Sequence, residues 1–173
     1  ADAAAVDAAV AQARAAQPGW ERTPLTERIA ILRAYASAVK AHADDVAQVI
    51  SRETGKPFWE TRTEAASVAA KVEISIAAQA DRAGETLRDG DGFALALRHR
   101  PHGVLAVLGP YNFPAHLPNG HVVPALLAGN AVVFKPSELA PATAELMGQL
   151  WREAGLPDGV LQIVQGGGET GKA

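Results

Sequence analysis

Three short apolar runs in the carboxyl-terminal half of the chain, separated by two helical stretches, most constrain the fold. The runs are "GVLAVL" at residues 103–108, "AVVF" at 131–134 and "VLQIV" at 160–164. The first two runs are continuously apolar, which is typical of strands that are buried in a parallel sheet, the first of them on both faces, and the third run predicts a third strand. We expect helices at about residues 117–127, ending before Gly129-Asn130, and at 143–154, ending before Gly155. This order predicts parallel pairing with right-handed crossovers, which is the first half of a doubly wound nucleotide-binding sheet in an α/β protein.

The amino-terminal half is expected to consist of long helices. Residues 1–17 are rich in alanine and should form a helix that ends at Pro18-Gly19. Thr23-Pro24 resembles an N-cap followed by proline at the first helical position. Apolar residues then recur every three or four positions up to Gly55, which predicts one long helix, and a further helix is expected from Pro57 to Gly84.

The chain therefore divides into three parts. Residues 1–87 are the helical segment, residues 88–102 a connecting strand region, and residues 103–173 the β-α-β-α-β half-sheet. The connecting region contains a turn-rich stretch, "RDGDG" at residues 88–92, followed by "FALALRHR" at 93–100. The second stretch alternates in part between apolar and polar residues, which favours a strand.

The composition excludes several classes of function. A net charge of −3 with 20% charged residues gives no basic field for nucleic acid. No apolar run approaches the roughly 20 residues that span a bilayer, and the first residues do not resemble a secretory signal. The absence of cysteine excludes disulfides, thiolate metal sites and a cysteine nucleophile within this stretch, and it fits a reducing cytoplasm. No metal site is expected, because no pair among the clustered histidines has the helical spacing of zinc ligands. These histidines are His99, His102, His116 and His121.

Three loops leave the carboxyl ends of the predicted strands, where ligands bind in open parallel sheets. They are "GPYNFP", "KPSE" and "QGGGETG". In the second loop, Pro136 fixes the backbone between Lys135 and Glu138, whose side chains could hold the two hydroxyls of an adenosine ribose. The carboxylate would repel the 2′-phosphate of NADP and would therefore favour NAD. The alternative is a surface turn that leads into a helix, with Ser137 or Glu138 near the helix N-terminus.

The third loop satisfies the pattern G-x-G-x-x-G through Gly166, Gly168 and Gly171. The match is weak as a pyrophosphate-binding fingerprint, because that fingerprint follows the first strand of a nucleotide-binding sheet and precedes an acidic residue about 20 positions later. We therefore expect a tight loop close to the ligand.

Asn112 is a single carboxamide in the first loop. An asparagine in a buried loop can satisfy its own backbone. It can also stabilise an oxyanion when its side chain is held at the end of a strand. The spacing leaves both interpretations open.

The stretches "GPYNFP" and "PALLAGNAVVFKPSE" resemble the aldehyde dehydrogenase superfamily. In that family an aromatic-Asn-Phe-Pro loop precedes a helix, then Gly-Asn, then an apolar strand that ends in Lys-Pro-Ser/Ala-Glu. The order and spacing match without a gap from Gly103 to Glu138, and the preceding helices and the later "AGLPDGVLQIVQG" also fit. The resemblance implies a Rossmann-like sheet of the aldehyde dehydrogenase type over nearly the whole chain.

The resemblance also implies roles for the loop residues. The Asn112 amide would hold the oxyanion of a thiohemiacetal that a cysteine forms with a small-molecule aldehyde. Phe113 and Leu117 would line the substrate tunnel, and the cofactor would be NAD. Residues expected to contact the cofactor are Leu108, Gly109, Pro110 and Tyr111 on the nicotinamide side, Lys135, Pro136, Ser137 and Glu138 at the adenosine ribose, and Gly167 and Gly168 near the adenine.

Several parts of the family pattern are missing from the sequence. These are the nucleophilic cysteine, the Glu-Leu-Gly-Gly stretch with the general base, and the Phe-Thr-Gly-Ser segment at the pyrophosphate. All of them come later in the family order, so we expect an inactive excerpt that lacks the catalytic domain of an active enzyme. Full-length members form dimers or tetramers, to which "FALALRHR" could contribute, although a plain edge strand is an equal alternative. A non-catalytic nucleotide-binding or interaction module is the other possibility for the whole chain.

Overall fold

The computed structural model describes all 173 residues, and its centre is a parallel sheet of three strands. The strands β3 (Val104–Leu108), β4 (Ala131–Lys135) and β5 (Leu161–Ile163) lie in the order β3-β4-β5. Val104 pairs with Ala131 and Val132 pairs with Leu161, both in parallel register. The crossover helices are α5 (His116–Leu127) and α6 (Pro141–Glu153). The predicted parallel half-sheet is confirmed.

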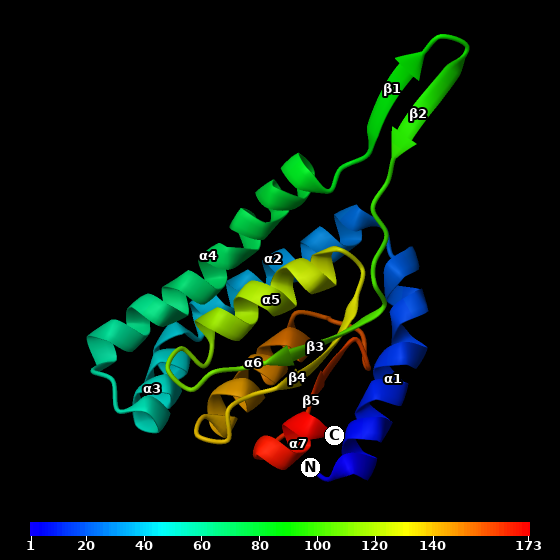
Figure 1. Ribbon diagram of the computed structural model, residues 1–173. Helices are drawn as coiled ribbons and strands as arrows, with labels where there is room; N and C mark the ends of the chain where they lie inside the picture. Colours follow the sequence, from blue (N-terminus) through cyan, green and yellow to red (C-terminus); the bar gives the residue numbers. More distant parts are fainter.

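Helices cover both faces of the sheet (Figure 1). Helix α1 (Ala3–Arg22) packs against one face, mainly on β4 and β5. Helices α5 and α6 cover the other face, and α2 (Leu25–Ala41), α3 (Ala43–Thr54) and α4 (Phe58–Arg82) form a further layer on them. The main core lies between these two helical layers and the sheet, around buried Trp20, Tyr35 and Trp151. No helix combines the length and the apolar character that crossing a membrane requires.

Strand β3 differs from the sequence-based prediction. Its residues Ala106 and Leu108 are exposed, with 66% of Leu108 accessible, whereas β4 is buried from Ala131 to Phe134. The prediction of burial on both faces is therefore wrong for β3. The reason is that β3 is an edge strand and α1 lies mainly over the other two strands.

Helix α1 continues through Pro18-Gly19 to Arg22, so the predicted end at this pair is wrong. A proline inside a helix removes one hydrogen bond and strains the preceding turn. Two contacts on either side of Pro18 hold the last turn in place. Gln17 Nε2 donates to the carbonyl of Gly129 at 3.1 Å, and the buried Trp20 Nε1 donates to the carbonyl of Leu126 at 2.9 Å.

The long helix predicted between Pro24 and Gly55 is two helices, α2 and α3, which His42 separates. His42 has φ −104° and ψ 24°, and its ring Nδ1 lies 3.0 Å from the carboxylate of Asp45. Because only one residue leaves the helical conformation, the apolar stripe remains in phase, and Leu32, Val39 and Val46 are all buried. Gly55 ends α3 in the left-handed conformation, as expected.

Strands β1 (Thr86–Gly90) and β2 (Phe93–Leu97) form an antiparallel hairpin that projects from the body of the molecule (Figure 1). The two-residue connection is Asp91-Gly92, with φ 79° at Gly92. The predicted strand at residue 93 is confirmed, but the predicted turn is too long, because residues 88–90 belong to β1. All hairpin residues are exposed.

Candidate functional site

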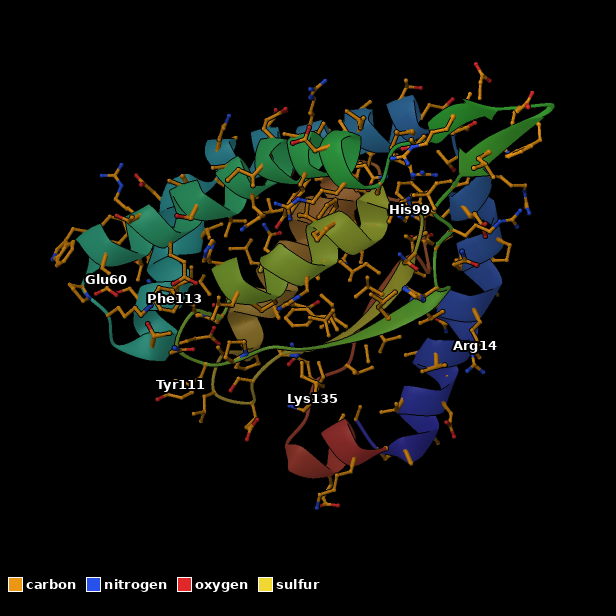
Figure 2. All side chains as sticks on the ribbon, turned by 45° about the horizontal axis from the view of Figure 1, so that its top comes forward. Arg14, Glu60, His99, Tyr111, Phe113 and Lys135 are labelled. Carbon is orange, nitrogen blue, oxygen red and sulfur yellow. The ribbon has the colours of Figure 1, made fainter.

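The loops that follow β3, β4 and β5 meet at the same edge of the sheet. The amide of Gly109 donates to the carbonyl of Lys135 at 2.8 Å, and the amide of Val164 donates to the carbonyl of Phe134 at 2.9 Å. Figure 2 shows Tyr111, Phe113 and Lys135 along this edge. The arrangement places the starts of the three loops beside one another.

Gly109, just after β3, lies close to Phe134 of β4 and Pro118 of α5. A Cβ atom on this residue would lie 2.8 Å from Cε2 of Phe134 and 3.1 Å from Cγ of Pro118. Both neighbours are rigid rings, and Phe134 is buried in the core. The chain can therefore turn away from β3 at this point only because residue 109 has no side chain.

The loop between Gly109 and Ala115 presents Asn112 at the surface. Asn112 is exposed, as are its neighbours Tyr111 at 59% and Phe113 at 37%. The contacts that order this loop lie on either side of Asn112: the Gly109 amide bonds to β4, and the Leu117 amide donates to the Phe113 carbonyl at 3.3 Å. Asn112 is therefore an exposed carboxamide on a tethered loop, and it does not satisfy a buried backbone.

Glu64 of α4 holds the far end of this loop. Helix α5 has alanine at its N-cap and no side-chain cap of its own. One carboxylate oxygen of the buried Glu64 accepts hydrogen bonds from the amides of Ala115 at 3.1 Å and His116 at 3.2 Å. Capping of this kind satisfies amides that the first turn of a helix leaves without partners.

Lys56 completes the contact between the helical layer and the loop. Its ammonium group lies 3.3 Å from Glu64, 3.6 Å from Glu60 and 3.5 Å from the centroid of the Phe113 ring. The figure shows Glu60 and Phe113 at the same end of the molecule (Figure 2). Neither Lys56 nor Glu64 was predicted from the sequence as a site residue. The one local signal was the lack of a capping residue before α5.

Lys135 and Glu138 lie together after β4. Lys135 Nζ is 3.5 Å from Glu138 Oε2 and donates to the Pro136 carbonyl at 2.8 Å. The lysine side chain is mostly covered, whereas the Glu138 side chain is 58% exposed. A hydrogen bond from its own backbone amide and the positive charge of Lys135 lower the pKa of the Glu138 carboxyl. The pair therefore offers a cation and an ionised carboxylate at the edge of the sheet.

The alternative interpretation of this loop is confirmed in part, because a turn at residues 137–140 leads into a helix, but neither Ser137 nor Glu138 caps that helix. Helix α6 begins at Pro141, and Glu53 of α3 caps it. The Glu53 carboxylate accepts from the amides of Ala142 at 2.7 Å and Thr143 at 2.8 Å. Ser137 forms a local turn instead, in which its hydroxyl accepts from the amide of Leu139 at 3.2 Å.

The glycine loop after β5 leads into a short helix that the sequence did not predict, α7 (Gly168–Lys172), with Gly167 as its N-cap. A Cβ atom on Gly166 would overlap the hydroxyl of Thr170, which itself donates to the Ala1 carbonyl at 2.6 Å. The absence of a side chain at Gly166 therefore allows Thr170 to pack closely against the backbone of this loop. Gly167 and Gly168 have open space where a side chain would be.

No group of three histidine, cysteine, aspartate or glutamate side chains is arranged to hold a metal ion. Apolar side chains gather near the loops instead. Leu108 is 66% exposed, Leu117 42% and Leu139 61%. Exposed apolar residues next to polar loops are typical of binding or interaction surfaces.

Comparisons with known proteins identify the family of the chain. The sequence matches the profile of the Aldehyde dehydrogenase family over residues 1–173. The chain belongs to the aldehyde dehydrogenase family.

Individual members of the aldehyde dehydrogenase family are similar in sequence to this chain. It is 61% identical to N-succinylglutamate 5-semialdehyde dehydrogenase of Vibrio cholerae over 97% of the chain, and this covers 35% of that protein. It is 62% identical to N-succinylglutamate 5-semialdehyde dehydrogenase 1 of Caulobacter vibrioides over 99% of the chain and 36% of that protein. The chain thus spans about a third of the length of these relatives.

Solved structures of the family share the fold. An aldehyde dehydrogenase from Brucella melitensis biovar abortus superposes with a TM-score of 0.91 at 36% identity, over 97% of this chain and 35% of that one. A lactaldehyde dehydrogenase superposes with a TM-score of 0.92 at 34% identity, over 99% and 36% of the two chains. The fold expected from the resemblance to the aldehyde dehydrogenase family is therefore confirmed.

Proposed function

We propose that this chain is the amino-terminal part of an NAD-dependent aldehyde dehydrogenase that oxidises an aldehyde to a carboxylate through a cysteine thiohemiacetal. The observation that carries the proposal is the exposed Asn112 carboxamide, on a loop whose first residue, Gly109, is tethered to the carbonyl of Lys135. Family membership and the coverage of about a third of each relative support it. The nucleophile and the general base belong to parts of the enzyme outside these residues.

In this mechanism Asn112 acts on the developing negative charge. When a thiolate attacks the aldehyde carbon, the carbonyl oxygen becomes an oxyanion, and the Asn112 Nδ2 group donates a hydrogen bond to it. A donor fixed before the reaction stabilises the transition state more than the substrate, because it needs no reorientation. Phe113 and Leu117, both partly exposed beside this loop, would line the path of the substrate.

The residues at the adjacent strand end fit a dinucleotide. Lys135 and Glu138 would hold the adenosine ribose, with Pro136 and Ser137 shaping their turn, while Leu108 to Tyr111 would lie along the nicotinamide. Gly167 and Gly168 leave open space that suits the adenine. NAD, when bound, supplies the hydride acceptor of the reaction.

The choice of NAD over NADP rests on the Glu138 carboxylate. Its lowered pKa keeps it ionised at neutral pH, where it would repel a 2′-phosphate. We expect calorimetry on the full-length gene product to give at least about tenfold tighter binding of NAD than of NADP, which is about 1.4 kcal/mol. Glu138→Gln should reduce this preference. Tighter binding of NADP by the unmodified protein would contradict the role of Glu138.

The proposed substrate is succinylglutamate semialdehyde, an intermediate of arginine catabolism. Its support is the 59–62% identity to relatives that carry the name N-succinylglutamate 5-semialdehyde dehydrogenase. The direct test is the rate of NAD reduction with this aldehyde compared with lactaldehyde and other small aldehydes. A higher kcat/KM for lactaldehyde or another small aldehyde would contradict the proposed substrate.

The role of Asn112 can be tested in the same full-length enzyme. Asn112→Ala should lower turnover by about two to three orders of magnitude, the usual effect of removing one oxyanion donor. The dissociation constant for NAD, measured on the same variant, serves as the control and should change by less than about threefold, because the carboxamide acts at the aldehyde. Turnover close to that of the unmodified enzyme would contradict the mechanism.

A non-catalytic nucleotide-binding module is the second candidate, and the absence of cysteine from all 173 residues favours it. The encoding gene distinguishes the two. A reading frame that continues past Ala173 to a cysteine and a Glu-Leu-Gly-Gly stretch supports the enzyme. A frame without them supports the module.

The proposal includes assembly into a homo-oligomer, as a dimer or tetramer. The projecting hairpin β1–β2 supports it, because Phe93, Leu95 and Leu97 are each more than half exposed. An isolated two-stranded hairpin is marginally stable in water, so one with exposed apolar residues requires a covering surface.

A further inference from the structure

The buried carboxylate of Glu64, in α4, contacts backbone amides just after the loop that carries Asn112. We propose that Glu64, together with Lys56, is a positioning residue for the Asn112 carboxamide. This inference rests on the proposed function, since it assigns Glu64 a role only through the oxyanion donor. Glu64 itself touches neither the aldehyde nor the cofactor in this account.

The geometry forms a continuous path of contacts. Glu64 Oε1 accepts from the amides of Ala115 and His116, which follow Asn112 by three and four positions. Glu64 Oε2 pairs with Lys56 Nζ at 3.3 Å, and the same ammonium group lies 3.5 Å from the centroid of the Phe113 ring. Both contacts therefore act on residues one to four positions after Asn112.

A buried carboxylate such as that of Glu64 is an unusual cap for a helix, because it must be paired and hydrogen-bonded to be stable there. Its side chain is only 1% exposed, and burial of a charge costs free energy unless the charge is paired and hydrogen-bonded. A serine or aspartate at the N-cap would satisfy the α5 amides at little cost, but that position is the fully buried Ala115. What Glu64 adds over a local cap is a fixed relation between the loop and the rigid helix α4, which has 25 residues.

Positioning of this kind can affect catalysis strongly. An oxyanion donor must lie at hydrogen-bonding distance from the position that the oxygen occupies in the transition state. A misplacement of about 1 Å can lower the rate about 100-fold. Loss of the Glu64 contacts would loosen the carboxyl-terminal side of the loop, where the bond from the Leu117 amide to the Phe113 carbonyl would remain, while the Gly109 amide would still hold the other side on β4.

Glu53 provides a matched control. Its carboxylate caps α6 in the same way, through the amides of Ala142 and Thr143 and the Thr143 hydroxyl at 2.6 Å. Both glutamates reach from the helical layer to a crossover helix that lacks its own side-chain cap. Glu53, however, caps the helix that follows the loop after β4, and it makes no contact with the loop that carries Asn112. A general effect of losing a helix cap should therefore appear in both variants.

The experiment is a pair of double-mutant cycles in the full-length enzyme. Glu64→Ala and Glu53→Ala are each measured alone and together with Asn112→Ala, with kcat determined at saturating NAD and aldehyde. We expect Glu64→Ala to lower kcat by about 10- to 100-fold in the unmodified enzyme. In the Asn112→Ala background it should lower kcat by less than about threefold, because no carboxamide remains to be positioned. Glu53→Ala should change kcat by the same factor in both backgrounds.

Each outcome decides the inference. Equal effects of Glu64→Ala in the two backgrounds overturn it and leave the role of Asn112 intact. Full turnover of Asn112→Ala alone overturns the proposed mechanism and the inference with it, so the two failures are distinguishable. If Glu64→Ala does not give a folded protein by circular dichroism, Glu64→Gln goes through the same cycle with the same criterion, because its amide oxygen keeps an acceptor near the α5 amides while the pairing with Lys56 is lost.

Discussion

The burial of Tyr35 makes the stability of the fold depend on pH. Its side chain is fully buried, and its ring stacks on Trp151 with centroids 3.7 Å apart. Its hydroxyl donates to Oδ1 of Asn119 at 3.2 Å, and Nδ2 of Asn119 donates to the Val68 carbonyl at 3.0 Å. These contacts join α2, α4, α5 and α6 at one point. Burial raises the pKa of the Tyr35 hydroxyl far above its ordinary value of 10.0.

This shift predicts a loss of stability in alkali. The folded protein keeps the Tyr35 proton, whereas the unfolded chain releases it near pH 10. The contribution of Tyr35 is therefore complete below pH 10 and decreases above it, by about 1.4 kcal/mol per pH unit for one group. Tyr35→Phe should remove this slope and cost about 1 kcal/mol at neutral pH for the lost hydrogen bond.

Urea unfolding between pH 8 and 11 measures both effects. The exposed Tyr111 is the only other tyrosine of these 173 residues, and Tyr111→Phe is the matched control, which should keep the alkaline slope. An unchanged slope in Tyr35→Phe would show that Tyr35 does not lose its proton on unfolding in this range.

At the residue scale, the sequence predicted the candidate site residues that stand in short local motifs. Lys135 and Glu138 are neighbours in sequence as well as in space, and Asn112 stands in a distinctive loop. Glu64 and Glu53 were missed because each contacts backbone amides more than 50 positions later in the chain. One signal was available. Ala115 and Ala140 stand where a capping side chain normally precedes a helix, so a cap from elsewhere in the fold was required.

At the scale of elements, the order of helices and strands was more predictable than their ends. The apolar runs that became β3, β4 and β5 are bounded by glycines and prolines, and they pair as expected. Two helix boundaries were wrong because tertiary contacts outweighed local preference. Trp20 and Gln17 anchor α1 beyond Pro18, and α3 starts anew after His42 to pack on α4 and α6.

The edge position of β3 illustrates a different limit. A continuous apolar run indicates that both faces of a strand are to be covered, but it does not identify what covers them. Here α1 lies over β4 and β5, and Leu108 is left exposed beside the loop that carries Asn112. The apolar residue at this strand end, Leu108, is therefore part of the candidate site and not of the buried core.

At the scale of the whole molecule, the polar loops and the hairpin lie in different places. The loops gather where the strands β3 to β5 end, while the hairpin extends away from the body beyond α4 (Figure 1). Along β2, Phe93, Leu95 and Leu97 share one face because side chains alternate along a strand. Ala94 and Ala96 lie on the opposite face. The first face carries three large apolar side chains, whereas the opposite face carries one, Leu87 of β1, which pairs with Ala96, so the proposed contact between copies has a preferred side.

Substitutions on the two faces of β2 test this assignment in the full-length protein. Leu95→Glu would place a charge in the proposed interface opposite Arg88 of β1, and removing an ion from water costs several kcal/mol even where a partner offsets part of that cost. We expect the association constant to fall at least about 100-fold, so that sedimentation equilibrium detects smaller species. Ala94→Glu adds the same charge on the opposite face and should leave the assembly unchanged. If Leu95→Glu keeps the assembly of the unmodified protein, copies do not meet through this face, and its apolar side chains must be covered by another segment of the same chain.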